Sequence, residues 1–94
     1  MKYITWNKEK NKQLKKERNI SFEIVSYLIE TKQVLDIIKH PNKDKYPNQR
    51  IFVILYNNYV YLVPFVEDEE QIFLKTIMPS RKATKKYLKG DKNG

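Results

Sequence analysis

The strongest constraint on the fold is a pair of apolar segments separated by two asparagines. Residues 51–56 and 59–66 are rich in β-branched and aromatic side chains, and only Asn57 and Asn58 lie between them. Asparagine tolerates the positive φ that a two-residue turn requires, so the pattern predicts an antiparallel β-hairpin. Pro64 lacks a backbone N–H donor, and we therefore expect it at a sheet edge or at a bulge.

Capping residues and apolar spacing predict the other elements. Asn7 and Ser21 can each cap a helix through the side-chain oxygen. The expected elements are a β-like entry over 3–6, helices over 8–18 and from residue 22, strands over 33–39 and 71–78, and a helix over 81–88. Short links between strands favour an antiparallel meander. The sequence thus predicts one α+β domain over 1–94, with an antiparallel sheet of about four strands, two N-terminal helices and one C-terminal helix. Residues 90–94 are expected to be frayed.

Several classes of site are disfavoured by composition. The 94 residues include no cysteine, which excludes disulfides and thiolate metal sites, and one histidine without a histidine–carboxylate spacing argues against zinc. Only two glycines are present, so there is no glycine-rich phosphate loop. We expect no metal and no cofactor. No apolar run approaches the ~20 residues of a membrane span, and the start lacks a signal-peptide core, so we expect a cytoplasmic protein without membrane contact.

The net charge of +8 is concentrated at the two ends of the chain. Residues 1–20 carry seven Lys/Arg and two Glu, a net charge of +5, and residues 75–94 carry seven Lys/Arg and one Asp, a net charge of +6. The acidic segment 67–70 contributes −4 and is expected to be a turn. If the two ends share one face, as we expect, they form a positive surface that attracts phosphates. Solvated lysine-rich helices explain the same charge equally well.

Three residues near element ends are candidates for chemistry. His40 begins the proline- and asparagine-rich loop 40–48, and it is the only side chain with an ordinary pKa near neutral pH. Arg50 precedes a hairpin strand, and Arg81 opens the last helix, where a cation is slightly unfavourable unless an anion joins it. An exposed loop imidazole and surface ion pairs are the alternative interpretations. We expect Arg50 and Arg81 to lie close together at one end of the sheet, where their planar guanidinium groups could both bind a phosphate.

Several segments resemble one toxin family. They are Trp6-Asn7, Lys10-Asn11, Ile20-Ser21-Phe22-Glu23, and Ile77-Met78-Pro79-Ser80-Arg81-Lys82-Ala83 followed by Tyr87. In this order and spacing they resemble the BrnT-type toxins of bacterial and archaeal toxin–antitoxin pairs, over roughly residues 3–88. Arg50 stands where that family has an arginine opening a core strand. One departure is Glu17-Arg18-Asn19, where the family usually has Lys-His-Gly. Arg18 could replace the charge of that histidine but not its proton chemistry.

The resemblance implies a RelE-like fold and a ribonuclease that cleaves RNA without metal. The ribose 2′-hydroxyl would attack the adjacent phosphate, with Arg50 and Arg81 stabilising the phosphate and His40 as acid or base. It further implies an antitoxin protein that covers the site and alone contacts operator DNA. The expected RNA-binding residues lie on the first and last helices: Lys15, Lys16, Arg18, Lys82, Lys85 and Lys86. A non-catalytic RNA- or DNA-binding module, and a basic domain that binds only an acidic partner such as the antitoxin, remain as alternatives.

Overall fold

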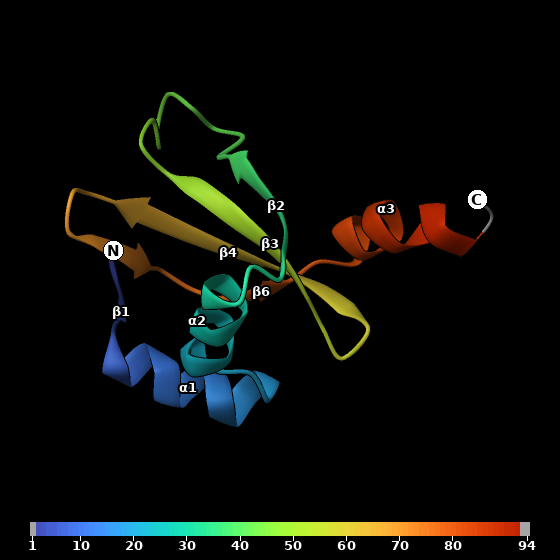
Figure 1. The fold of residues 1–94 in the computed structure, drawn as a ribbon, viewed down its shortest axis with the longest axis horizontal. Helices are drawn as coiled ribbons and strands as arrows, with labels where there is room; N and C mark the ends of the chain where they lie inside the picture. The colour runs from blue at the N-terminus through green and yellow to red at the C-terminus, as the bar shows by residue number, and fades with distance from the viewer. Residues whose placement is uncertain (1, 93–94) are drawn as a thin grey trace.

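The computed structural model describes residues 2–92, and it has the predicted α+β composition, with a six-stranded sheet and three helices (Figure 1). The elements in chain order are β1 (Tyr3–Trp6), α1 (Lys8–Arg18), α2 (Phe22–Glu30), β2 (Val34–Lys39), β3 (Arg50–Tyr56), β4 (Tyr59–Glu67), β5 (Gln71–Leu74), β6 (Met78–Pro79) and α3 (Arg81–Lys92). No helix in the described part of the chain is long and apolar enough to cross a membrane.

The hairpin that the asparagines predict is confirmed as β3 and β4. Asn57 and Asn58 form its turn with φ of 53° and 61°, in the left-handed region that this turn requires. The strand order is β1-β5-β4-β3-β2, with β6 also paired to β4. The expected antiparallel meander is present as β2-β3-β4-β5. The expectation that the whole sheet is antiparallel with about four strands is wrong, because β1 joins β5 in parallel and β6 also pairs with β4. The link from β1 to β5 passes through α1, α2 and the hairpin, so the rule for short links does not apply to this pair.

Pro64 explains why the last expected strand is interrupted. It lies within β4 opposite Ile51 of β3, so it is not at a sheet edge. The alternative expectation, a bulge, agrees with the register: β4 pairs Phe65 with Leu74 but Leu62 with Met78, so the three residues 75–77 lie opposite the two residues 63–64. The Pro64 carbonyl accepts from the Lys75 N–H at 2.8 Å. Because the N and C=O of one residue point to the same side of an antiparallel strand, the donor-free nitrogen faces the same irregular segment, 75–77. The predicted strand 71–78 is therefore divided into β5 and β6 at the position where β4 has no N–H to offer.

The main core lies between the sheet and the two N-terminal helices. Buried side chains from both layers form one cluster: Leu14, Ile20, Phe22, Val25, Phe52, Ile54, Val63, Phe65, Leu74 and Ile77. Trp6 stacks on Phe22 with ring centroids 5.8 Å apart, and Phe52 stacks on Phe65 at 4.0 Å. The aromatic pairs thus join β1 to α2 and β3 to β4.

Asn11 connects α1 to the start of α2. Its side chain is 5% exposed; its Oδ1 accepts from the Phe22 N–H at 2.8 Å and its Nδ2 donates to Glu23 Oε1 at 2.9 Å. Ser21 caps α2, as expected, by accepting from the Ile24 N–H at 3.3 Å. Asn11 and Glu23, two residues of the segments behind the family resemblance, therefore help to hold the two helices together.

The helix α3 packs against the opposite face of the sheet from α1 and α2. Its Tyr87 hydroxyl donates to Asp36 Oδ2 at 3.0 Å. Asp36 pairs with Val53, which alternates along β3 with the core residues Phe52 and Ile54 and so points away from them. Ser80 caps this helix by accepting from the Ala83 N–H at 3.0 Å.

The helix α3 is longer than expected. The sequence places its end at about residue 88, and residues 90–94 are expected to be frayed, but the helix continues to Lys92. Positions 93–94 lie outside the described residues.

Candidate functional site

A cleft at one end of the sheet brings two of the three candidate catalytic residues together. It has a volume of about 430 Å³ and lies where β2 ends and β3 begins. Its lining residues are Lys39, His40, Lys43, Tyr46, Pro47, Asn48, Gln49, Arg50 and Glu67. His40 and Arg50 both line the cleft, together with two lysines, so the cleft combines an imidazole with three basic side chains.

Backbone and side-chain hydrogen bonds shape the loop over this cleft. The His40 N–H donates to the Gln49 carbonyl at 3.1 Å, which extends the β2–β3 ladder by one step. Asn42 then closes a turn, because its carbonyl accepts from the Tyr46 N–H at 3.0 Å and its Oδ1 accepts from the Lys45 N–H at 3.1 Å. The asparagine thereby accepts hydrogen bonds from backbone N–H groups of the loop that have no partner strand. The loop carries the His40 and Tyr46 rings to within 4.4 Å of each other, tilted by 42°.

The hydrogen bond to His40 decides which nitrogen carries its proton. Nδ1 accepts from the Asn42 N–H at 3.1 Å. The neutral imidazole therefore carries its proton on Nε2, and in this tautomer neither nitrogen is free to accept another proton from substrate. The charged form carries a proton on both nitrogens, so it must give up the hydrogen bond from Asn42 before it can donate from Nε2. Either role that the sequence leaves open for His40, acid or base, therefore requires the Asn42 N–H to move off Nδ1.

Arg50 is held by a carboxylate and an aromatic ring. Its guanidinium carbon lies 5.2 Å from the Phe65 ring centroid, and its Nη2 donates to Glu67 Oε1. The second oxygen of Glu67 accepts from Lys2 Nζ at 2.6 Å. The hydrogen bond from Lys2, followed by the charges of Lys2 and Arg50, lowers the pKa of Glu67 below its ordinary value, although partial burial opposes the shift. Glu67 is consequently a poor general base.

Arg81 lies away from the cleft, so the expected arginine pair does not form. Arg50 is opposite Phe65 on β4, whereas Pro79, two residues before Arg81, is opposite Tyr61. The four intervening steps along β4 span about 13 Å at ~3.3 Å per residue. Arg50 lies at the open end of the β3–β4 hairpin. Arg81, by contrast, follows β6, which pairs with β4 nearer to the turn at Asn57 and Asn58. The prediction that the two side chains meet at one end of the sheet is wrong.

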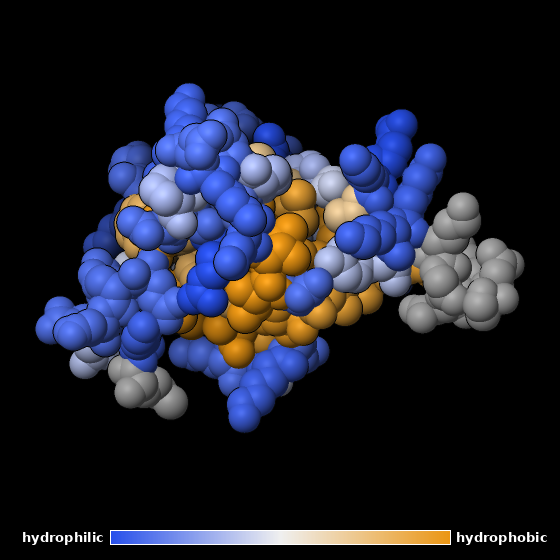
Figure 2. All heavy atoms as spheres, turned by 90° about the horizontal axis from the view of Figure 1, so that it is seen from above, coloured by the Kyte–Doolittle hydropathy of each residue, from blue (hydrophilic) through white to orange (hydrophobic). Residues whose placement is uncertain are grey.

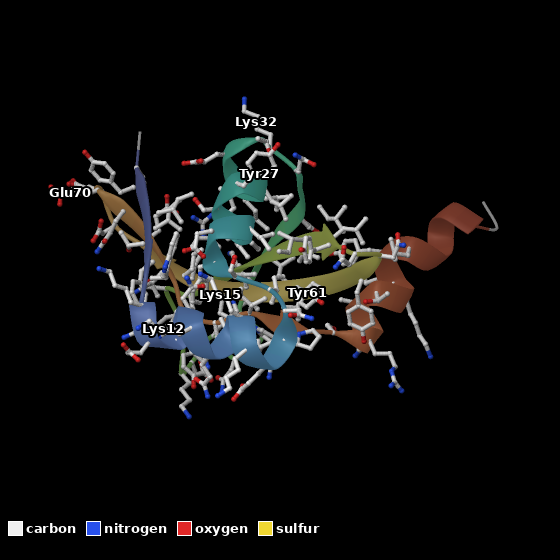
Figure 3. The ribbon with its side chains drawn as sticks, turned by 90° about the horizontal axis from the view of Figure 1, so that it is seen from below. Lys12, Lys15, Tyr27, Lys32, Tyr61 and Glu70 are labelled. Atoms are coloured by element: carbon white, nitrogen blue, oxygen red, sulfur yellow. The ribbon has the colours of Figure 1, made fainter. Side chains whose placement is uncertain are left out.

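The two groups of basic residues also do not form one face. Lys15, Lys16 and Arg18 belong to α1, while Lys82, Lys85 and Lys86 belong to α3 on the other side of the sheet. Figure 3 shows Lys12 and Lys15 on α1 beside α2, with α3 extending away from both. Arg18 of α1 is engaged by the backbone just before β6, because its Nη1 donates to the Ile77 carbonyl at 2.7 Å.

The two basic groups lie on opposite sides of the sheet, so the described residues do not form a single continuous basic patch. This placement weakens the charge argument for RNA binding. Lys15 is further engaged by Glu23, with Nζ and Oε1 3.6 Å apart. Seen from above, hydrophilic side chains cover the loop side and α3, and a hydrophobic area lies between them (Figure 2). The cleft is therefore a better candidate for an anion site than the two basic helices together.

Sequence reasoning missed five side chains that this site uses. Four line the cleft, and the fifth, Lys2, is the partner of Glu67: the lining residues are Lys39, Lys43, Tyr46 and Glu67. Glu67 was assigned only to an acidic turn, and its partner Lys2 is 65 positions away in the sequence. No local spacing signals such a pair. The two prolines and the asparagines around Tyr46 do indicate an ordered loop, and an aromatic residue within such a loop is a signal that could have placed Tyr46 near His40.

Comparisons of the chain with protein-family models, with curated proteins and with solved structures find no match. The chemistry of the cleft therefore carries the functional inference.

Proposed function

We propose that this protein is a toxin of a type II toxin–antitoxin pair, a BrnT-type, RelE-like endoribonuclease that cleaves RNA in the cytoplasm without a metal. The observation that supports this proposal most is the shared cleft of His40 and Arg50. A proton donor and a planar cation facing one space are two of the groups that cleavage of a phosphodiester needs. The family resemblance adds the expectation of an antitoxin partner that covers the cleft and contacts operator DNA.

In this mechanism Arg50 binds the scissile phosphate and stabilises its developing negative charge. Its side chain is 47% exposed, and the contact with Glu67 uses one of its terminal nitrogens, Nη2. The 2′-hydroxyl attacks phosphorus and loses its proton to water, and the leaving 5′-oxygen takes a proton from Nε2 of the His40 imidazolium, which forms when Nδ1 takes up a proton and the Asn42 N–H leaves it. The products are a 2′,3′-cyclic phosphate and a free 5′-hydroxyl. Lys39 and Lys43 hold neighbouring phosphates, and Arg81 with the α3 lysines attracts RNA over a longer distance.

A second candidate function, RNA binding without cleavage, has its own support. Nδ1 of His40 is occupied by Asn42, and Arg50 is engaged by Glu67, so both proposed groups already have partners in the free chain. A basic cleft with a tyrosine and a histidine ring is also typical of surfaces that stack unpaired bases.

One experiment separates the two candidates. A labelled single-stranded RNA is incubated in EDTA with the parent protein and with His40→Gln, Arg50→Ala and Lys45→Gln. Lys45→Gln is the control, because it removes a cation from the same loop outside the cleft lining. We expect Arg50→Ala to lower the cleavage rate by about 10²–10³-fold, as for one lost stabilising donor. His40→Gln should also lower it strongly, whereas Lys45→Gln should cleave nearly as the parent does.

A substrate with a single 2′-deoxyribose at the cleavage position should resist the parent protein. Cleavage of that substrate, or equal rates for the parent and Arg50→Ala, would refute the mechanism. Tight RNA binding by a parent protein that cleaves nothing would instead favour the second candidate.

A further inference from the structure

Two cations from distant parts of the chain converge on one carboxylate at the edge of the cleft. Lys2 precedes β1, Arg50 opens β3, and Glu67 ends β4. Lys2 Nζ lies 2.6 Å from Glu67 Oε2, and Arg50 Nη2 donates to Oε1 of the same carboxylate. Each oxygen of Glu67 therefore faces its own cation.

This arrangement matches the way in which proteins bind a phosphodiester. The two non-bridging oxygens of a phosphodiester carry one negative charge, as the two oxygens of a carboxylate do, and both accept charge-assisted hydrogen bonds. The Phe65 ring supports the guanidinium plane of Arg50 against the wall of the cleft. The side chains of Lys2 and Arg50 are 36% and 47% exposed, so an incoming anion can reach both.

Glu67 can leave this position without unfolding the turn that follows it. Asp68, not Glu67, holds the turn, because its Oδ1 accepts from the backbone N–H groups of Glu70 and Gln71 at 2.8 and 2.9 Å. The Glu67 side chain can thus rotate towards solvent while the backbone stays in place. Ion pairs between partly exposed side chains are weak, so a phosphate competes with this one on favourable terms.

We infer that Lys2 and Arg50 form a two-cation phosphate site, which the carboxylate of Glu67 fills in the free protein and which an RNA backbone phosphate takes over on binding. The assignment of the phosphate to RNA rests on the proposed function; the competition between Glu67 and an anion does not. The inference adds Lys2 to the substrate-binding residues and makes Glu67 an internal competitor.

The opposite role for Glu67 is that of a brace that orients Arg50 for substrate. The two roles predict changes of opposite sign. Removing a competitor strengthens the binding of an anion, whereas removing a brace weakens it. The sign of the change in affinity on Glu67→Gln therefore decides between them.

The probe is a fluorescent 2′-O-methyl RNA octanucleotide, which cannot be cleaved by 2′-hydroxyl attack, and its binding is followed by anisotropy at low salt. Glu67→Gln should bind about five-fold more tightly than the parent, the factor expected when a weak ion pair no longer competes. Glu69→Gln is the matched control: it removes the same charge from the same turn, and no described residue forms an ion pair with it. We expect less than about two-fold tightening there, from long-range charge alone.

The cation pair is tested in the Glu67→Gln background. Adding Lys2→Gln or Arg50→Gln should each reverse the tightening. Glu67→Asp, whose shorter carboxylate cannot reach both cations, should lie between the parent and Glu67→Gln, and it serves as the second variant if Glu67→Gln folds poorly by circular dichroism.

Affinity for Glu67→Gln equal to or below that of Glu69→Gln would overturn the inference, and so would an unchanged affinity on adding Lys2→Gln. Tightening in a protein that cleaves no RNA would leave this phosphate site standing while the nuclease proposal fails. Cleavage that depends on Arg50 without tightening in Glu67→Gln would refute the competitor role alone.

Discussion

Replacement of Asn11 by alanine tests how the two N-terminal helices are held together. The change removes two hydrogen bonds and leaves the Phe22 N–H, which donates to Asn11 Oδ1 at 2.8 Å, without a partner in a buried position. An unsatisfied buried donor costs ~1–3 kcal/mol, and the loss of the contact with the exposed Glu23 carboxylate adds on the order of 0.5–1 kcal/mol. We therefore expect the free energy of unfolding to fall by about 2–4 kcal/mol.

Asn11→Asp gives the same experiment a pH dependence. The carboxylate keeps an acceptor for the Phe22 N–H but places a second negative charge next to Glu23. In the parent, the hydrogen bond from Asn11 is the main cause that lowers the pKa of Glu23 below 4.5. The parent therefore gains stability from Glu23 above that pH and loses it as the pH falls through the lowered value. In the variant, like-charge repulsion acts at neutral pH and is relieved on protonation. The difference in the free energy of unfolding between the parent and Asn11→Asp should therefore narrow from pH 7 to pH 3.

Urea unfolding followed by circular dichroism measures both effects. Gln13→Ala is the control, because Gln13 is exposed on the same helix and its side chain donates a hydrogen bond to the exposed Glu17, at 3.3 Å. Its free energy of unfolding should stay within about 0.5 kcal/mol of the parent value. A loss below about 1 kcal/mol for Asn11→Ala, or a gap for Asn11→Asp that widens in acid, would refute the reasoning.

Two further predictions concern the two faces of the sheet. Phe65→Ala removes a buried ring stacked on Phe52 and should lower the free energy of unfolding by about 3–5 kcal/mol in urea titrations, whereas a loss under about 1 kcal/mol would contradict the described core. Tyr87→Phe removes the hydrogen bond to Asp36 and should cost at most ~1 kcal/mol while speeding amide exchange in α3; unchanged exchange there would mean that this contact does not hold the helix on the sheet.

Local interactions made much of the fold predictable. Asn7 accepts from the Lys10 N–H at 2.9 Å, and Asn19 ends α1 in the left-handed conformation with φ of 55°. Asn57 and Asn58 reverse the chain between two apolar strands. Each signal involves residues within a few positions of one another, so the amino-acid types alone carry the information. This is why the helix starts, the hairpin and the α+β class follow from the sequence.

The candidate site was only partly predictable for the same physical reason. His40 and Arg50 flank one loop, so the short link between two paired strands brings them to one cleft. Arg50 and Arg81 are on different elements, and the register of β6 on β4 separates them. The resemblance to a toxin family did not predict which residues meet at the cleft, because its N-terminal segments, Asn11 among them, join α1 to α2.

What the sequence by itself determined is the set of local structures: the capped helices, the asparagine turn and the ordered loop that begins at His40. What only the tertiary structure decided is how those structures meet. The parallel pairing of β1 with β5 places Lys2 beside Glu67, 65 positions away, and the alternation of side chains along β3 puts α3 on the face opposite α1. Such contacts depend on strand order and register, which arise from the packing of the whole core rather than from the preferences of neighbouring residues.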